Sequence, residues 1–161
     1  NGGREMRFGR LRLFNANGSQ LIAMPIPMQA QFWNGGGFVT NTADNCTAIA
    51  PGNVALGNYQ KNLNAGETVV SGGGTFSAGV SLLRLSAPGA ANNGSVDVSV
   101  NLTGVPAGAS CTAGMPASTP TLLTHLQGAW GGAAYNRDPT ARATFGLYRD
   151  TEQLIYRREN Y

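Results

Sequence analysis

Residues 94–102 read GSVDVSVNL, and this stretch decides the fold class. Valine or leucine stands at every even position from Val96 to Leu102, and a polar residue stands at every odd one. Alternation with a period of two is typical of a β-strand that has one buried face and one wet face. The sequence therefore predicts a strand here, with Asp97 and Ser99 on the solvent side.

Other segments follow the same pattern on both sides of this strand. Gly or Asn-Gly turn signals separate them, and NGGG at 34–37 predicts the turn of a hairpin into FVTNT. Residues 43–74 are loop-like, and LLTHLQGAW at 122–130 predicts one short helical turn and no long helix. The expected strands are MRFGRLRLF (6–14), GVSLLRLSAPG (79–89), ATFGLYR (143–149) and QLIYRREN (153–160), the last two forming a C-terminal hairpin.

The segment LIAMPIPMQAQFW at 21–33 has extended character but contains two prolines. Because proline donates no backbone hydrogen bond, Pro25 and Pro27 fit only at a sheet edge or before regular pairing begins. The proline-bearing segment and the N-terminal NGGREM are therefore the candidates for an unpaired edge or an exchanged strand, through which copies could associate.

Length and composition indicate one all-β domain over residues 1–161. The chain has 23 glycines, 42% apolar residues and a single lysine, Lys61, and 161 residues can bury a substantial core. We expect an antiparallel β-sandwich with long Gly/Asn-rich loops. The start NGGREM, without an initiator methionine, predicts a processed product or a piece of a longer protein.

Charge is concentrated at the two ends of the chain, at Arg4–Arg12 and Arg137–Glu159. Both ends alternate as strands and both are rich in arginine, which predicts that the first strand lies beside the C-terminal hairpin in one sheet. The shared core would then include Phe8, Leu11, Leu13, Phe145, Leu147 and Ile155.

Several functional classes are disfavoured. The net charge of +3 comes from arginines interleaved with apolar residues, without the continuous basic run of a nucleic-acid footprint. The apolar runs are too short to span a membrane. His125 is the single histidine, no catalytic motif accompanies it, and the acidic residues are scattered, so we expect neither an enzyme nor a cofactor.

Cysteine occurs twice, at Cys46 and Cys111. In a lysine-poor, Gly/Asn/Thr-rich chain, an even pair predicts one disulfide in an oxidising compartment, which would stabilise the fold by roughly 4 kcal/mol in the chain-entropy model. Two unpaired thiols are the alternative.

Aromatic residues offer a second candidate site. Trp33, Trp130 and Tyr135, together with Tyr148, could form a platform on which a sugar stacks. Core packing is the competing interpretation for the tryptophans, because each flanks a glycine-rich turn that it could cover. Their exposure in a structure separates these interpretations.

Four segments in order carry a resemblance to a known family: FGRLRLFNANGSQL, QFWNGGGFVTNTADNCT, LSAPGAANNGSVDV and DPTARATFGLYRDTEQLIYRREN. They resemble the C-terminal domain of the MSHA biogenesis protein MshQ and its relatives, which are bacterial surface proteins encoded with type IV pilus machinery. The resemblance places Cys46 on the cysteine of the family's NTxDxC segment and brings no catalytic residue. The turn after Trp130 reads AWGGAAYNRDP, and because a calcium loop needs several oxygen ligands and only Asp138 is in reach, we expect no metal site there.

Two hypotheses on function follow. The resemblance implies that residues 1–161 are the C-terminal part of a longer exported protein. It also implies a non-catalytic structural or assembly module of an extracellular or outer-surface protein, with protein partners in a pilus or surface assembly. The aromatic residues and long loops support a carbohydrate- or ligand-binding adhesin module instead, and a filament subunit formed by strand exchange is a further variant.

Overall fold

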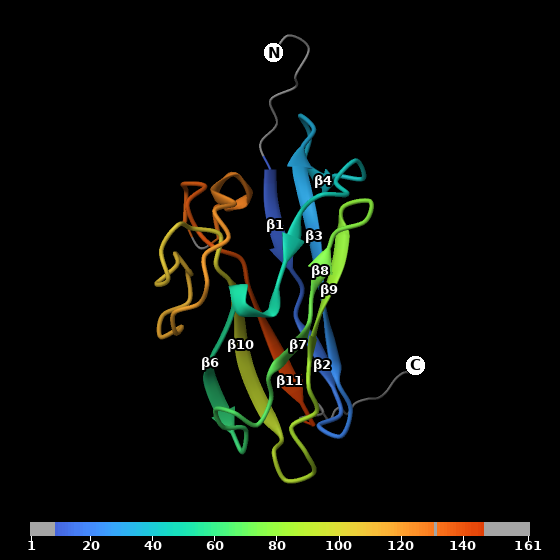
Figure 1. Ribbon diagram of the computed structural model, residues 1–161, viewed down its shortest axis with the longest axis vertical. Coiled ribbons are helices and arrows are strands. Elements are labelled where there is room, and N and C mark those ends of the chain that lie inside the picture. Colours follow the sequence, from blue (N-terminus) through green and yellow to red (C-terminus); the bar gives the residue numbers. More distant parts are fainter. Residues whose placement is uncertain (1–8, 131, 147–161) are drawn as a thin grey trace, which may run out of the picture.

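A computed structural model describes residues 9–130 and 132–146. Within this part, strands and two 3-10 helices follow one another, and Figure 1 labels most of the strands. In chain order they are β1 (Gly9–Leu13), β2 (Ala16–Gly18), β3 (Met24–Trp33), β4 (Phe38–Thr40), β5 (Ala48–Ile49), η1 (Pro51–Asn53), β6 (Val54–Lys61), β7 (Val70–Gly72), β8 (Gly74–Thr75), β9 (Val80–Leu85), β10 (Gly94–Val100), η2 (Thr124–Leu126) and β11 (Thr140–Phe145).

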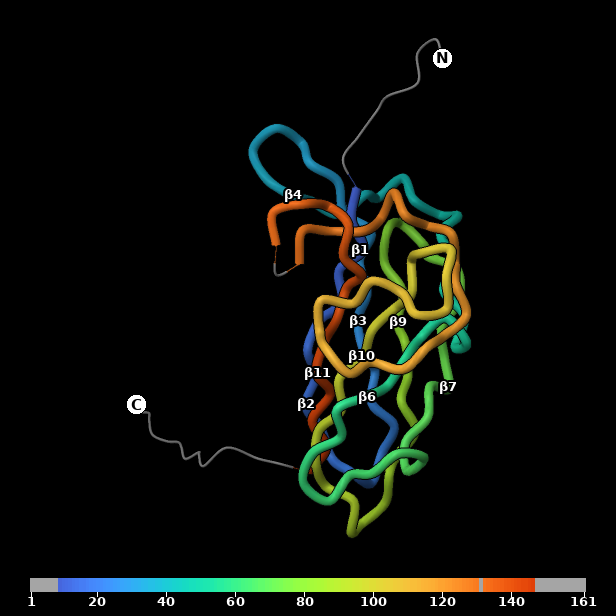
Figure 2. The backbone as a smooth tube through the Cα atoms, turned by 90° about the vertical axis from the view of Figure 1, so that its left-hand side faces the viewer, coloured from blue at the N-terminus to red at the C-terminus, as the bar shows by residue number. Residues whose placement is uncertain are grey.

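Two main sheets face each other. The five-stranded sheet has the order β1-β3-β9-β7, with β4 also paired to β3, and the four-stranded sheet has the order β2-β11-β10-β6. A small third sheet pairs β5 with β8. Figure 2 shows the four-stranded sheet in front of β3 and β9, with the long loop of residues 103–123 lying over it. The predicted all-β sandwich is confirmed.

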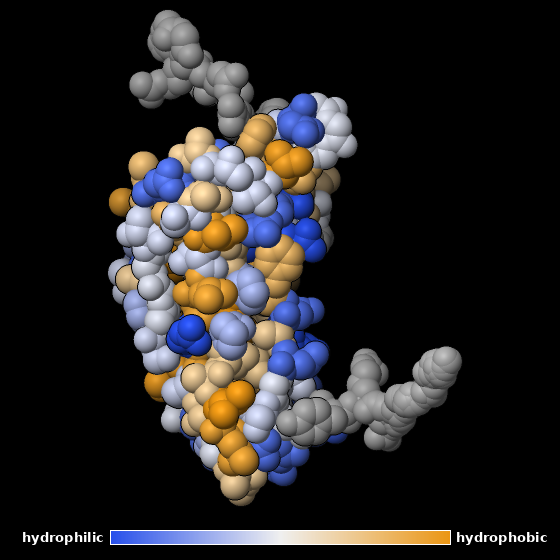
Figure 3. Space-filling model, turned by 90° about the vertical axis from the view of Figure 1, so that its right-hand side faces the viewer, coloured by the Kyte–Doolittle hydropathy of each residue, from blue (hydrophilic) through white to orange (hydrophobic). Residues whose placement is uncertain are grey.

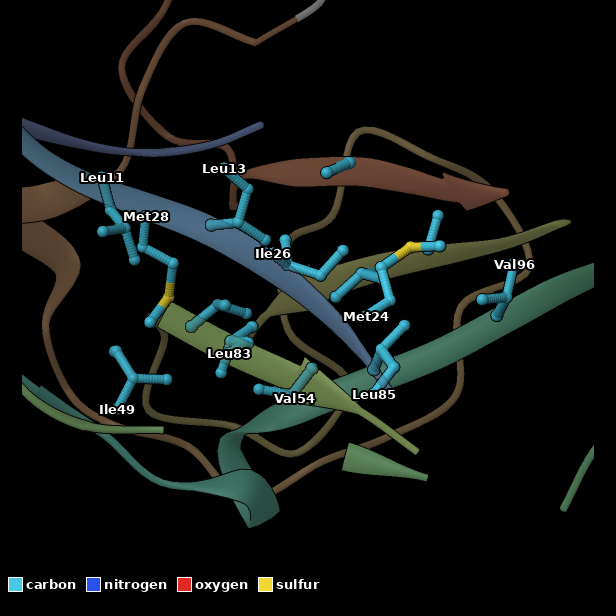
Figure 4. Close-up of a cluster of buried hydrophobic side chains, with 14 of the residues drawn as sticks. Leu11, Leu13, Met24, Ile26, Met28, Ile49, Val54, Leu83, Leu85 and Val96 are labelled. Carbon is cyan, nitrogen blue, oxygen red and sulfur yellow. The ribbon is translucent and has the colours of Figure 1, made fainter. Parts of the chain in front are cut away.

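The core fills the space between the two main sheets. Alternate residues of β3 and β9 point inward, and the even-numbered valines of β10 meet them from the other side (Figure 4). The largest side chains that solvent does not reach include Phe76, Phe145 and Leu11. Burial of such side chains is the main favourable term in the free energy of folding.

The first and last described strands lie in different sheets, and the prediction of one shared sheet is wrong for β1. β1 pairs with β3 in the five-stranded sheet. The chain then crosses to the other sheet, where the short β2 pairs in parallel with β11. Leu11, Leu13 and Phe145 nevertheless share one core, as predicted. Phe8, Leu147, Ile155 and the second strand of the predicted hairpin lie outside the described residues.

The proline-bearing segment forms strand β3. Residues 24–27 pair with β9 on one side only, beyond the end of β1, so Pro25 and Pro27 lie at a sheet edge, as predicted. Residues 24–29 of β3 pair with β9 and residues 28–32 pair with β1. The Pro27 carbonyl accepts a hydrogen bond from the Phe14 amide at 3.1 Å, on the side of β3 where β1 lies. The nitrogen and the carbonyl of one residue in an antiparallel strand point to the same side, so the Pro27 nitrogen also faces away from β9. The missing N–H groups therefore leave the pairing with β9 intact.

The polar side of β10 is buried, contrary to the predicted wet face. All seven residues of β10 are buried, and Asp97 is only 6% exposed. β6, which falls in the segment predicted to be loop-like, pairs along β10, and the long loop covers the outward face. The alternating sequence of β10 predicts one exposed face. Burial of the second face depends on a distant segment, the long loop, which the local pattern does not indicate.

Helical structure in the described part is limited to η1 and η2, and η2 falls within the predicted helical turn. Neither has the length or the apolar character needed to cross a membrane.

Candidate functional site

Five side chains gather on the outward face of the five-stranded sheet and are called the aromatic–arginine cluster: Arg10, Trp33, Phe38, Trp130 and Tyr135. The pairing of strands explains three of them. Arg10 of β1 lies opposite Gln31 of β3, and Trp33, two residues further along β3, lies opposite Phe38 of β4. Directly opposite residues share a face of an antiparallel pair, so all three point outward.

Phe38 lies at the centre of this cluster. Its ring meets the Trp33 ring edge-on, with centroids 5.4 Å apart, and the Tyr135 ring at 6.2 Å. The Arg10 guanidinium carbon lies 3.8 Å from the Phe38 centroid and 4.7 Å from that of Trp130. A cation between two aromatic faces is attracted by both, and each contact contributes about 0.5–2 kcal/mol depending on desolvation.

The segments 129–130 and 132–136 bring Trp130 and Tyr135 to the cluster. Gly128 and Arg137 close their base through two backbone hydrogen bonds of 2.9 and 3.1 Å. A Cβ atom added at Gly128 would lie 2.5 Å from the Trp130 indole nitrogen, so the indole packs directly against glycine backbone. That indole nitrogen is buried and has no hydrogen-bond partner among the described residues.

A chain of side-chain hydrogen bonds along the outward face of β3 orients Arg10. The Arg10 Nε donates to Gln31 Oε1 at 2.8 Å, Gln31 Nε2 donates to Gln29 Oε1, and the Thr40 hydroxyl also donates to Gln29 Oε1. Burial lowers the pKa of Arg10 from its ordinary value, Arg12 lowers it further, and Tyr135 opposes both. The hydrogen bond to Gln31 fixes the orientation of the guanidinium.

Of the sequence-predicted platform, Trp33, Trp130 and Tyr135 are brought together at one place, and Tyr148 lies outside the described residues. Trp33 is 44% exposed and Tyr135 is 49% exposed, whereas Trp130 is partly buried. The two tryptophans are not both core residues, which keeps a binding interpretation open. Sequence reasoning missed Arg10 and Phe38. Phe38 could have been found from the predicted hairpin, because a tight turn at 34–37 places Phe38 opposite Trp33.

A comparison with known families identifies the chain. The model described as DUF6701, fourth domain, matches residues 7–160. The chain belongs to this family. No curated protein and no solved structure matches it.

The predicted disulfide is absent from this DUF6701 domain, where both cysteines are free and exposed. Each is tied to a different part of the fold. The Cys46 amide donates to Asp44 Oδ1 in the loop after β4, whereas the Cys111 sulfur lies 3.8 Å from the Thr140 hydroxyl at the start of β11. The long loop containing Cys111 is fastened instead by side-chain amides. Asn58 Nδ2 donates to the Ala113 carbonyl at 2.9 Å.

A cavity of 290 Å³ at one end of the DUF6701 domain contains its histidine. His125 and Asp44 both line it, and the charge of His125 contributes to lowering the pKa of Asp44. Among the described residues, no hydrogen bond joins His125 to Asp44 or to Cys46, and no group of three His, Cys, Asp or Glu side chains could hold a metal ion. The cavity offers no assembled nucleophile and base.

Proposed function

We propose that the chain is a non-catalytic assembly module of a bacterial cell-surface protein linked to type IV pilus biogenesis or adhesion. The resemblance of four ordered segments to the C-terminal domain of MshQ supports the pilus connection. The family is described as a fourth domain, which agrees with a module of a larger protein. In this proposal the protein is exported and its partners are proteins of the surface assembly, not nucleic acid.

The aromatic–arginine cluster is the observation that carries the proposal. Tryptophan, tyrosine and arginine contribute a disproportionate share of binding energy at protein interfaces. Here they converge on an open sheet face, and Trp33 and Tyr135 are about half exposed. Large aromatic side chains left exposed beside a held guanidinium are suited to contact with a partner.

A complementation experiment in the source bacterium tests this function. Deletion of the coding region for residues 7–160 should reduce surface pili counted by electron microscopy, and the intact chain should restore them. A Trp33→Ala/Tyr135→Ala double variant should be exported at the normal level and fail to restore them. Normal piliation of the deletion strain would overturn the pilus connection.

A second candidate function is carbohydrate binding, as in an adhesin module. The exposure of Trp33 and Tyr135 favours it, because aromatic rings open to solvent present flat apolar faces to sugars. A glycan array probed with the wild-type chain and with Trp33→Ala tests it. Binding that the variant loses supports a sugar platform, and absence of any glycan binding by the folded wild-type chain removes it.

A further inference from the structure

The Arg10 side chain has three contacts within the cluster, and the two terminal nitrogens of its guanidinium are the basis of the inference. The Phe38 and Trp130 rings contact its guanidinium, and Gln31 accepts from its Nε. Its two terminal nitrogens have no hydrogen-bond partner among the described residues, and the residue is partly exposed. A guanidinium fixed by stacking and by Nε keeps its outer edge ready for a bidentate acceptor.

The described part of the chain provides no carboxylate for this edge. It contains four acidic residues, and each is engaged elsewhere. Asp44 accepts from Thr47, Glu67 accepts from Asn64, Asp97 pairs with Arg142, and Asp138 is buried among backbone amides. Arg10 and Arg12 stand two residues apart on β1 and share its outward face, so the local charge is positive.

The surroundings of Arg10 also have the features of a sugar-binding surface. The exposed Trp33 and Tyr135 rings lie within one ring contact of Arg10 through Phe38. Beside them stand amide and hydroxyl groups of Gln29, Gln31 and Thr40. The cavity near His125 is lined by none of the cluster residues. An open surface with aromatic stacking faces and neighbouring polar groups fits a pyranose ring.

We propose that the aromatic–arginine cluster binds an acidic glycan, with a sugar carboxylate on Arg10 and a pyranose face stacked on Trp33 or Tyr135. The inference rests on the second candidate function and narrows it to carboxylate-bearing sugars. It is independent of the pilus connection.

The experiment uses the 161-residue chain and tetragalacturonate, with the fully methyl-esterified tetrasaccharide as a matched uncharged probe. Binding is followed by tryptophan fluorescence and isothermal titration calorimetry. We expect the acid to bind and the ester to bind about tenfold more weakly or worse. Arg10→Gln should weaken binding of the acid by about tenfold or more. Arg10→Lys should recover part of it, because charge returns without the planar fork.

Arg84→Gln is the matched control, because Arg84 is an exposed arginine on β9 of the same sheet, opposite Pro25. It should bind the acid as the wild type does. Trp33→Ala, at the exposed end of β3, provides a second variant whose folding does not depend on the stacked arginine, and about fivefold weaker binding is expected. Circular dichroism melts confirm that each variant is folded.

Each outcome separates the possibilities. Equal binding of acid and ester overturns the acidic-glycan inference and leaves a neutral sugar platform. Equal losses in Arg10→Gln and Arg84→Gln, removed by salt, indicate unspecific attraction and also overturn it. Tighter, Arg10-dependent binding of a polyglutamate peptide would replace the glycan by an acidic protein partner. If the folded chain binds no glycan on an array, both the inference and the carbohydrate function fail.

Discussion

The two outward faces of the sandwich are built in opposite ways. On the four-stranded sheet, Asp97 and Ser99 point outward and are buried beneath the long loop of residues 103–123 (Figure 2). On the five-stranded sheet, Val80 and Leu82 point outward and are 45% and 43% exposed. Figure 3, which views the latter side, shows apolar patches among hydrophilic ones along the length of the molecule. The polar face is covered and part of the apolar face is open.

The covered face is polar because its cover is irregular backbone. Loop carbonyls and amides cannot pair with one another as strands do, so side chains must satisfy them. Asn101 Nδ2 donates to the carbonyls of Val105 and Ser118, and its Oδ1 accepts from the Thr103 amide. Asp138 accepts from the amides of Leu102 and Ala109. The buried polar side chains of this face hold the long loop against the sheet through these hydrogen bonds.

On the open face of the five-stranded sheet, apolar side chains are exposed to solvent instead of polar side chains being buried. Its aromatic and aliphatic side chains stabilise little by lying in water, and they become useful when a partner covers them. Under our proposal the covered face serves stability and the open face serves recognition, and the four predictions below test which side chains stabilise the fold.

The largest expected contrast lies between two neighbours on β9. Leu83 points inward and solvent does not reach it, whereas Leu82 points outward. Leu83→Ala should lower the free energy of unfolding by about 2–5 kcal/mol, and Leu82→Ala by less than about 1 kcal/mol. Urea unfolding followed by circular dichroism measures both. Similar losses in the two variants would show that the outward face is covered.

Asp138→Ala should have the next largest effect. The substitution leaves the Leu102 and Ala109 amides and the Gln127 side-chain amide without their shared acceptor. Unsatisfied buried donors should cost about 3 kcal/mol in the free energy of unfolding. Glu67→Ala, in an exposed turn, is the control and should cost less than about 1 kcal/mol. A loss at Asp138 no greater than that at Glu67 would contradict the fastening role.

Asn101→Ala should detach the long loop with a smaller loss, about 2 kcal/mol. Its side chain is buried, and it contacts both ends of the loop, near Val105 and near Ser118. Hydrogen exchange measured by mass spectrometry should rise in residues 103–120 and stay unchanged in β3 and β9. The control Asn64→Ala lies in an exposed turn and should leave the pattern as it is. Exchange that rises uniformly would mean global destabilisation.

The smallest expected effect is a pH dependence at Asp44. Burial raises the pKa of Asp44, but hydrogen bonds from the Thr47 side chain and backbone, the Cys46 amide and the charge of His125 outweigh burial, so the pKa lies below its ordinary value. A carboxyl group with a lowered folded-state pKa stabilises the fold above its unfolded pKa, near 4, and the contribution is lost as pH falls through the folded value.

Asp44→Asn should therefore reduce stability slightly at pH 7 and flatten the loss of stability below pH 4. Melting temperatures between pH 2 and pH 7 measure this difference. Thr47→Val, which removes the side-chain hydrogen bond, should act in the same direction and by less. A wild-type and an Asp44→Asn profile that run parallel through the acid range would show that Asp44 does not titrate differently in the folded state.

Much of the fold is predictable from local pattern. The strands at β1, β9, β10 and β11, the hairpin at 34–37 and the helical turn at η2 all follow from alternation and turn residues. β6 is missed because VALGNYQK lacks clean alternation, and its conformation depends on pairing with β10. For the site, exposed-aromatic reasoning finds Trp33, Trp130 and Tyr135. It misses Arg10, whose role depends on rings that are distant in the sequence.

The sequence by itself determined that the chain is all-β and which residues of β9 and β10 face the core, because side-chain direction alternates along a strand whatever its neighbours are. Only the tertiary structure decided what covers each outward face. The path of the long loop makes Asp97 a buried residue, and the crossing after β1 separates the first strand from β11. Coverage depends on contacts between segments far apart in the chain, and no local pattern encodes those contacts.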